Sequence, residues 1–133
     1  MKKARISIAT LFALVLTGTA AAGAGAAPTS LSEGVYTAEQ AESGKPLFEK
    51  SCNACHNADF YKTVLQTWRG EPMQYLFEQV MSAMPADNPG SLYDTEYEQI
   101  FAHILELVGF PAGDTELSYS SGMMMDVEVE SAP

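Results

Sequence analysis

Two cysteines and a histidine lie close together near the middle of the chain, in the order Cys52-Asn53-Ala54-Cys55-His56. A C-x-x-C-H pentapeptide is the attachment signature of c-type haem, in which both thiols are bonded to the macrocycle. On one helical turn the two cysteines would share a face, so both sulfurs could reach one edge of the haem. The pattern therefore predicts one covalently bound haem c on Cys52 and Cys55, with His56 as an axial iron ligand.

Two other chemistries use a pair of cysteines at this spacing. A thioredoxin-like redox site needs a βαβ setting, and a structural zinc site needs four ligands from Cys, His or carboxylate side chains. The chain has 2 cysteines and 2 histidines, and nothing around His103 resembles a second ligand pair. Both alternatives lack the partners they need, so haem attachment is the favoured interpretation.

A second iron ligand is expected from a loop that follows an apolar helix. Pro72 favours a helix start, as the first helical residue, and the next apolar residues repeat at a spacing of three to four. These residues are Met73, Leu76, Phe77 and Val80. Pro85 pushes Met84 out of helical geometry, and Asn88-Pro89-Gly90 is typical of a turn. We predict that Met84 gives its thioether to the iron, whereas Met73 and Met81 pack on the helix face.

The helices on either side of these motifs have their own signals. Thr37-Ala38-Glu39-Gln40 has the form of a capping box, so a helix is expected to start there. Pro46 predicts a kink or a restart in that helix, before the core candidates Leu47 and Phe48. The last long helix is predicted over residues 94–108, since Gly109 follows it and Pro111 lies just beyond.

Three further residues are candidates for the haem site. Trp68 is the only tryptophan, and its indole N–H needs an acceptor if it is buried; a haem propionate is one, with Arg69 offsetting the carboxylate charge. Ordinary packing explains Trp68 equally well. Residues 61–68 predict a short helical turn. His103 falls on the apolar stripe of the last helix, where core packing is a commoner role than iron ligation.

Residues 1–26 have the composition of an export signal. Lys2, Lys3 and Arg5 precede an apolar run over residues 6–16 and an Ala/Gly stretch with A-x-A sites. Because this run is shorter than the roughly 20 residues that span a bilayer, we expect cleavage and a periplasmic location, without membrane insertion. Cleavage would leave four basic and 17 acidic residues, so the formal charge of the mature chain is −13. Such a charge disfavours nucleic acid and anionic membrane surfaces as partners.

The mature chain divides into a domain over residues 27–117 and a tail over residues 118–133. The tail is acidic and rich in Ser and Met, and its strand-like alternation over residues 126–130 is short, so we expect it to be loosely ordered. Met123, Met124 and Met125 are consecutive, so their three thioethers cannot all face one ion. Surface packing is therefore a better interpretation of this run than soft-metal binding.

Residues 37–117 resemble the class I cytochromes c. Besides the haem pentapeptide, three stretches are similar to small bacterial members, including those that serve quinoprotein alcohol dehydrogenases: residues 84–92, residues 97–105 and Gly109-Phe110-Pro111-Ala112-Gly113. The resemblance implies an all-α cytochrome c fold of about four to five helices around one haem, with an N-terminal helix crossing a C-terminal one. It also implies His56 and Met84 as axial ligands. The glycine-proline pair often found after the haem motif, whose proline carbonyl orients the proximal imidazole, is absent.

The sequence predicts an electron carrier and not an enzyme. One electron at a time would move on a haem held by His56 and Met84, between a dehydrogenase, such as a quinoprotein alcohol dehydrogenase, and an oxidase or cytochrome acceptor. Met/His ligation raises the reduction potential of such a haem. Two alternatives stay open: a haem protein with an open distal site that binds gas or is catalytic, and a dedicated cytochrome subunit of a dehydrogenase complex.

Overall fold

The computed structural model describes residues 26–133. Of the predicted export signal, residues 1–25 lie outside this range. The described chain is helical and contains no strand, only two isolated β-bridges at Glu128. Its elements, in order, are η1 (Leu31–Glu33), α1 (Ala38–Ser51), α2 (Ala58–Trp68), α3 (Met73–Ala83), α4 (Asp94–Val108) and η2 (Met123–Met125). The predicted all-α class is confirmed, with four α-helices. None of the helices in this range is both long and apolar enough to cross a membrane.

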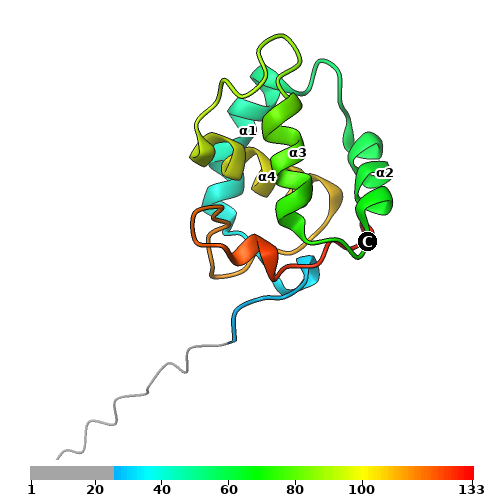
Figure 1. The fold of residues 1–133 in the computed structure, drawn as a ribbon, viewed down its shortest axis with the longest axis vertical. Helices are drawn as coiled ribbons and strands as arrows, with labels where there is room; N and C mark the ends of the chain where they lie inside the picture. The colour runs from blue at the N-terminus through cyan, green and yellow to red at the C-terminus, as the bar shows by residue number, and fades with distance from the viewer. Residues whose placement is uncertain (1–25) are drawn as a thin grey trace, which may run out of the picture.

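Helices α1 and α4 pack directly against each other (Figure 1). Their backbones approach most closely at Gly44, where a Cβ would overlap the carbonyl group of Gln99. Phe48, one turn further along α1, is buried with Ile100 and Ile104 of α4. Glycine at position 44 is therefore a condition of this crossing. The predicted bounds of the last helix are confirmed, and Gly109 ends it with a left-handed φ of 104°.

Two details of α1 differ from the prediction. Thr37 does cap the helix, since its hydroxyl accepts the N–H of Gln40, but the Gln40 side chain does not complete a capping box. Instead it donates to the carbonyl of Leu117 at 2.7 Å and accepts the Leu117 N–H at 2.8 Å. The second difference is that α1 runs through Pro46 without a break. The proline is exposed, so it removes one hydrogen bond while the packing on α4 holds the helix together.

Helices α2 and α3 surround the rest of the interior. Helix α2 is a full 11 residues, longer than the predicted turn, and Asn57 caps it by accepting the N–H of Phe60 at 3.0 Å. Pro72 is the N-cap of α3 and not its first helical residue. Met84 follows α3 in extended geometry, with φ −126° and ψ 155°, so the prediction that Pro85 takes it out of the helix is confirmed.

The tail after residue 118 is ordered, and the prediction of a loose segment is wrong. Val127 and Val129 are fully buried, and so is Met124 in the methionine run. The tail backbone bonds to distant segments: the N–H of Val129 donates to the carbonyl of Glu71 at 2.9 Å, and that of Glu128 to Thr29 at 2.8 Å. The short alternation is thus a half-buried extended segment. Its backbone is held by the connection between α2 and α3 and by the segment before η1.

Candidate functional site

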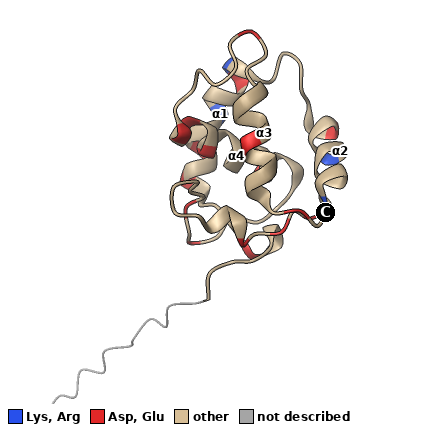
Figure 2. Cartoon of the chain, viewed as in Figure 1, with Lys and Arg blue, Asp and Glu red and all other residues tan. Residues whose placement is uncertain are grey.

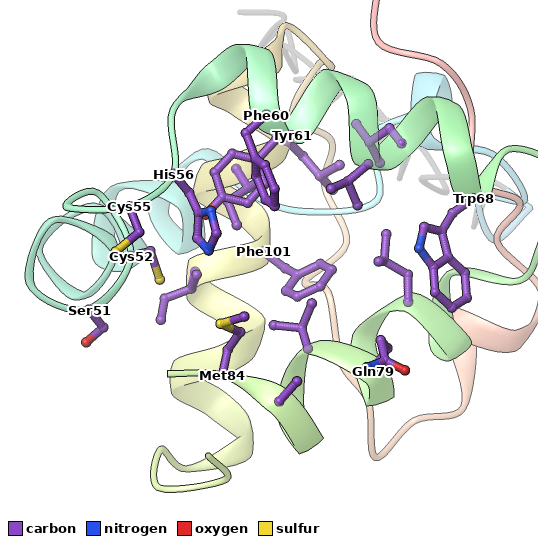
Figure 3. A pocket seen from close by; sticks show the side chains of 18 of the residues that line it. Ser51, Cys52, Cys55, His56, Phe60, Tyr61, Trp68, Gln79, Met84 and Phe101 are labelled. Carbon is purple, nitrogen blue, oxygen red and sulfur yellow. The ribbon is translucent and has the colours of Figure 1, made fainter. Parts of the chain in front are cut away.

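A cavity of ≈ 280 Å³ lies between α2, α3 and α4, beside the end of α1. Apolar side chains form most of its wall, and both cysteines lie at one end of it (Figure 3). An apolar cavity with a few polar groups is the usual form of a cofactor site. Its lining residues are Ser51, Cys52, Cys55, His56, Phe60, Tyr61, Val64, Leu65, Trp68, Leu76, Gln79, Val80, Ala83, Met84, Ala86, Ile100, Phe101, Ile104 and Leu105.

The pentapeptide forms a turn at the end of α1. The carbonyl of Cys52 accepts the N–H of Cys55 at 3.1 Å and the N–H of His56 at 3.0 Å, which closes one helix-like turn. Both cysteines are free of disulfides, and burial raises the pKa of the Cys52 thiol. This turn places the two sulfurs on the same end of the cavity, as the spacing predicts.

The imidazole of His56 lies among aromatic rings. It stacks on Phe60, with ring centroids 4.1 Å apart and planes inclined by 21°, and the ring of Tyr61 meets it edge-on at 5.8 Å. The Nδ1 atom of His56 is buried and has no hydrogen-bond partner within residues 26–133. The ring is therefore held by packing, and it projects toward the cavity (Figure 3).

Met84 projects into the cavity from the wall opposite His56 (Figure 3). Its backbone carbonyl accepts the hydroxyl of Tyr97 at 2.6 Å and the N–H of Gly90 at 3.2 Å. Tyr97 belongs to α4 and is buried, so it fixes the Met84 loop to the C-terminal helix. Neither Met73 nor Met81 lines the cavity, which leaves Met84 as the methionine beside it.

The remaining candidate residues differ in whether they line the cavity. Trp68 lines it from the last turn of α2, whereas the neighbouring Arg69 is exposed and is not part of its wall. His103 does not line the cavity either; it is 8% exposed and packs edge-on against Phe48 at 5.2 Å. The structure therefore brings together the cysteines, His56, Met84 and Trp68, and leaves Arg69 and His103 outside.

The sequence interpretation missed most of the wall that α2 supplies. Tyr61, Val64, Leu65 and Trp68 all face the cavity. Their spacing of three, four and seven residues is the signal of an amphipathic helix, and it was present in the sequence. Burial raises the pKa of the Tyr61 hydroxyl, so the phenol stays protonated at the cavity wall.

The residues present fit a haem. The wall is apolar, two thiols lie at one end, and an imidazole and a thioether project from opposite sides. These are the donor groups that hold haem iron in His/Met-ligated cytochromes. Within residues 26–133, no group of three or more His, Cys, Asp or Glu side chains could hold a metal ion by itself. The zinc alternative thus has no ligand set in this part of the chain.

The chain matches a known protein family. Residues 39–104 match the family described as "Cytochrome C oxidase, cbb3-type, subunit III". The matched segment runs from α1 into α4 and includes the haem pentapeptide and Met84. No curated protein and no solved structure matches the chain significantly. The match identifies a c-type cytochrome domain, which implies a covalently bound haem c, and Cys52 and Cys55 fit its attachment.

Proposed function

We propose that this c-type cytochrome is a periplasmic electron carrier, with His56 and Met84 as the axial ligands of its haem. The observation that carries the proposal is the pair of donor groups that enter one apolar cavity from opposite sides. When bound, the haem supplies an iron that cycles between the ferric and ferrous states. The export-type composition of residues 1–26 supports the periplasmic location.

The side chains around the cavity have distinct tasks in this proposal. Met84 closes the distal side, so no substrate binds, and its soft sulfur favours the ferrous state and raises the reduction potential. Apolar residues such as Leu76 and Phe101 exclude water from the site. Tyr97 holds the backbone of Met84 in place through its hydroxyl. The chain thus keeps both axial positions filled while electrons enter and leave.

The partners are redox proteins, and we propose a dehydrogenase as donor, including the quinoprotein alcohol dehydrogenase type, with an oxidase or another cytochrome as acceptor. Charge supports a partner with a basic docking surface, because residues 26–133 contain 17 acidic residues and four basic ones, which lie on α1 or at α2 (Figure 2). They are Lys45, Lys50, Lys62 and Arg69. The 17 acidic residues outnumber them, so a basic surface on the partner would be attracted to this chain.

The family description favours a second candidate, in which the chain is a cytochrome subunit of a larger redox complex. The haem chemistry is the same in both candidates. They differ in whether the chain binds its redox partner transiently, as a carrier, or stably, as a subunit. Purification of the native protein separates them. A carrier elutes as a free small protein, whereas a subunit elutes with its complex.

Carbon monoxide binding to the ferrous protein tests the proposed ligand pair. Because Met84 fills the distal position, we expect slow or negligible binding, together with a reversible one-electron titration. Rapid binding on mixing would contradict the proposal and support a haem with an open distal site.

A further inference from the structure

His56 lacks the contact that normally orients an iron-bound histidine. Such residues almost always donate their second ring N–H to a carboxylate, a carbonyl or water, which fixes the ring and its tautomer. In residues 26–133 the buried Nδ1 of His56 has no such partner. The nearest polar side chain in sequence, Asn57, is already engaged with the N–H of Phe60. Within this range no protein group orients the imidazole through Nδ1, so the protein contact that can orient it is one to the ring itself.

Phe60 supplies that contact. Its ring lies nearly parallel to the imidazole, at 4.1 Å and 21°, which covers one face of His56. Tyr61 meets the imidazole edge-on at 5.8 Å and 65°, and meets Phe60 at 5.3 Å and 81°. Offset-stacked and edge-to-face arrangements are those that aromatic rings prefer. Together the two rings restrict rotation of the imidazole about its Cβ–Cγ bond.

The position of Phe60 is itself fixed relative to His56. Asn57 directly follows the histidine, and its side chain accepts the Phe60 N–H at 3.0 Å, which closes the first turn of α2. Phe60 is 43% exposed, so core burial explains little of its placement. Tyr75 on α3 is exposed to the same degree, 45%, yet it does not line the cavity. Tyr75 therefore provides a matched control.

We infer that Phe60 is a positioning residue that sets the plane of the His56 imidazole by stacking, in place of a hydrogen bond to Nδ1. The inference rests on the proposed role of His56 as an iron ligand. The electronic states of a low-spin ferric haem depend on the orientation of its axial imidazole. Removing the flat ring from position 60 should therefore change signals from the haem while the helices stay folded.

The test compares Phe60→Leu, Phe60→Tyr and Tyr75→Leu by proton NMR and electron paramagnetic resonance of the ferric protein. In Phe60→Leu we expect a smaller spread of the hyperfine-shifted haem methyl resonances and broader paramagnetic signals, because the imidazole samples several orientations. Phe60→Tyr retains the ring and should give the wild-type spectra. Tyr75→Leu should also leave them unchanged. Circular dichroism confirms that each variant is folded.

Unchanged spectra in folded Phe60→Leu would overturn the inference and leave the ligand assignment intact. A wild-type protein without low-spin ferric signals would instead contradict the proposed function. If Phe60→Leu does not accumulate, Phe60→Met provides a second non-aromatic side chain with good helix propensity. The same altered methyl spread is expected from it, and wild-type spectra from Phe60→Met would overturn the inference equally.

Discussion

The two sides of α4 are packed in opposite ways. On one side α1 lies directly on it, so close that Gly44 has no room for a side chain against Gln99. On the other side α2 and α3 also contact α4, for example through Phe77 and Phe101, whose ring centroids lie 5.0 Å apart, but a cavity opens between the three helices. The first interface is closed along the whole crossing, whereas part of the second side lines the cavity in which the haem would lie. We infer that the haem is a structural part of the second side.

The largest expected effect comes from removing the haem attachment. Cys52→Ala combined with Cys55→Ala leaves the cavity side without the group that joins its walls, and so short a chain has little stability to spare. The double variant should accumulate as a largely unfolded or degraded chain. Amide NMR of the haem-free protein checks this, and a well-dispersed spectrum would mean that the cavity side supports itself.

On the opposite side of α4, Gly44→Ala should be strongly destabilising. The added Cβ would overlap the Gln99 carbonyl, so α1 and α4 must move apart. Overpacking of this kind costs about 1–3 kcal/mol, and we expect the upper end because the obstacle is backbone. Chemical denaturation of the holoprotein measures it. Glu42→Ala, at an exposed position of the same helix, is the control, and equal stability of the two variants would refute the close crossing.

Tyr97→Phe tests how the Met84 loop is held to α4 on the cavity side. The substitution removes the hydroxyl that holds the Met84 carbonyl to α4, at 2.6 Å in the wild type. Because Gly90 still donates to that carbonyl, the loss should be only about 1 kcal/mol. The loop should also open more often, so carbon monoxide should bind faster to the ferrous variant. An unchanged rate would show that the loop is held by other contacts.

The smallest effect is expected at Glu98, which is buried on α4 and accepts the N–H of Tyr119 at 2.7 Å. Burial raises the pKa of Glu98, with smaller contributions from Asp94 and Glu116, although the bond from Tyr119 lowers it. The folded state therefore holds this proton at a higher pH than the unfolded state, and the stability it contributes is lost as pH rises through the raised pKa.

Glu98→Gln keeps an oxygen acceptor for the Tyr119 N–H and removes the charge. The variant should be more stable than wild type at pH 7, by up to about 0.5 kcal/mol. The difference should shrink as the pH falls toward 4.5, the usual pKa of a glutamate. Thermal denaturation over this pH range measures it. A variant that is less stable at neutral pH would show that the carboxylate is stabilising in its charged form.

Local signals predicted the elements that depend on local chemistry. The bounds of α4 follow from its apolar stripe and from Gly109, and the extended geometry of Met84 follows from Pro85. Contacts between distant segments could not be predicted in this way. Gln40 bonds to Leu117, 77 residues away, and Val129 is ordered by Glu71. The five-residue alternation over residues 126–130 gives no sign of such a partner, so the sequence alone predicts a loose tail.

The same limit applies to the candidate site. The pentapeptide and the Met84-Pro85 pair carry their chemistry in sequence, but the stacking of Phe60 on His56 depends on how α2 starts after the motif. Arg69 was expected at the haem because it follows Trp68. The helix ends at Trp68, however, and Arg69 lies exposed outside the cavity wall.

The most direct test of the account is the near-infrared band that arises from charge transfer between a methionine sulfur and ferric iron. Wild type should show it, and Met84→Ala should lose it and have a lower reduction potential, since the soft sulfur no longer stabilises the ferrous state. Met81→Ala is the control, because Met81 does not line the cavity and should change stability alone. Loss of the band in Met81→Ala with retention in Met84→Ala would contradict the ligand assignment.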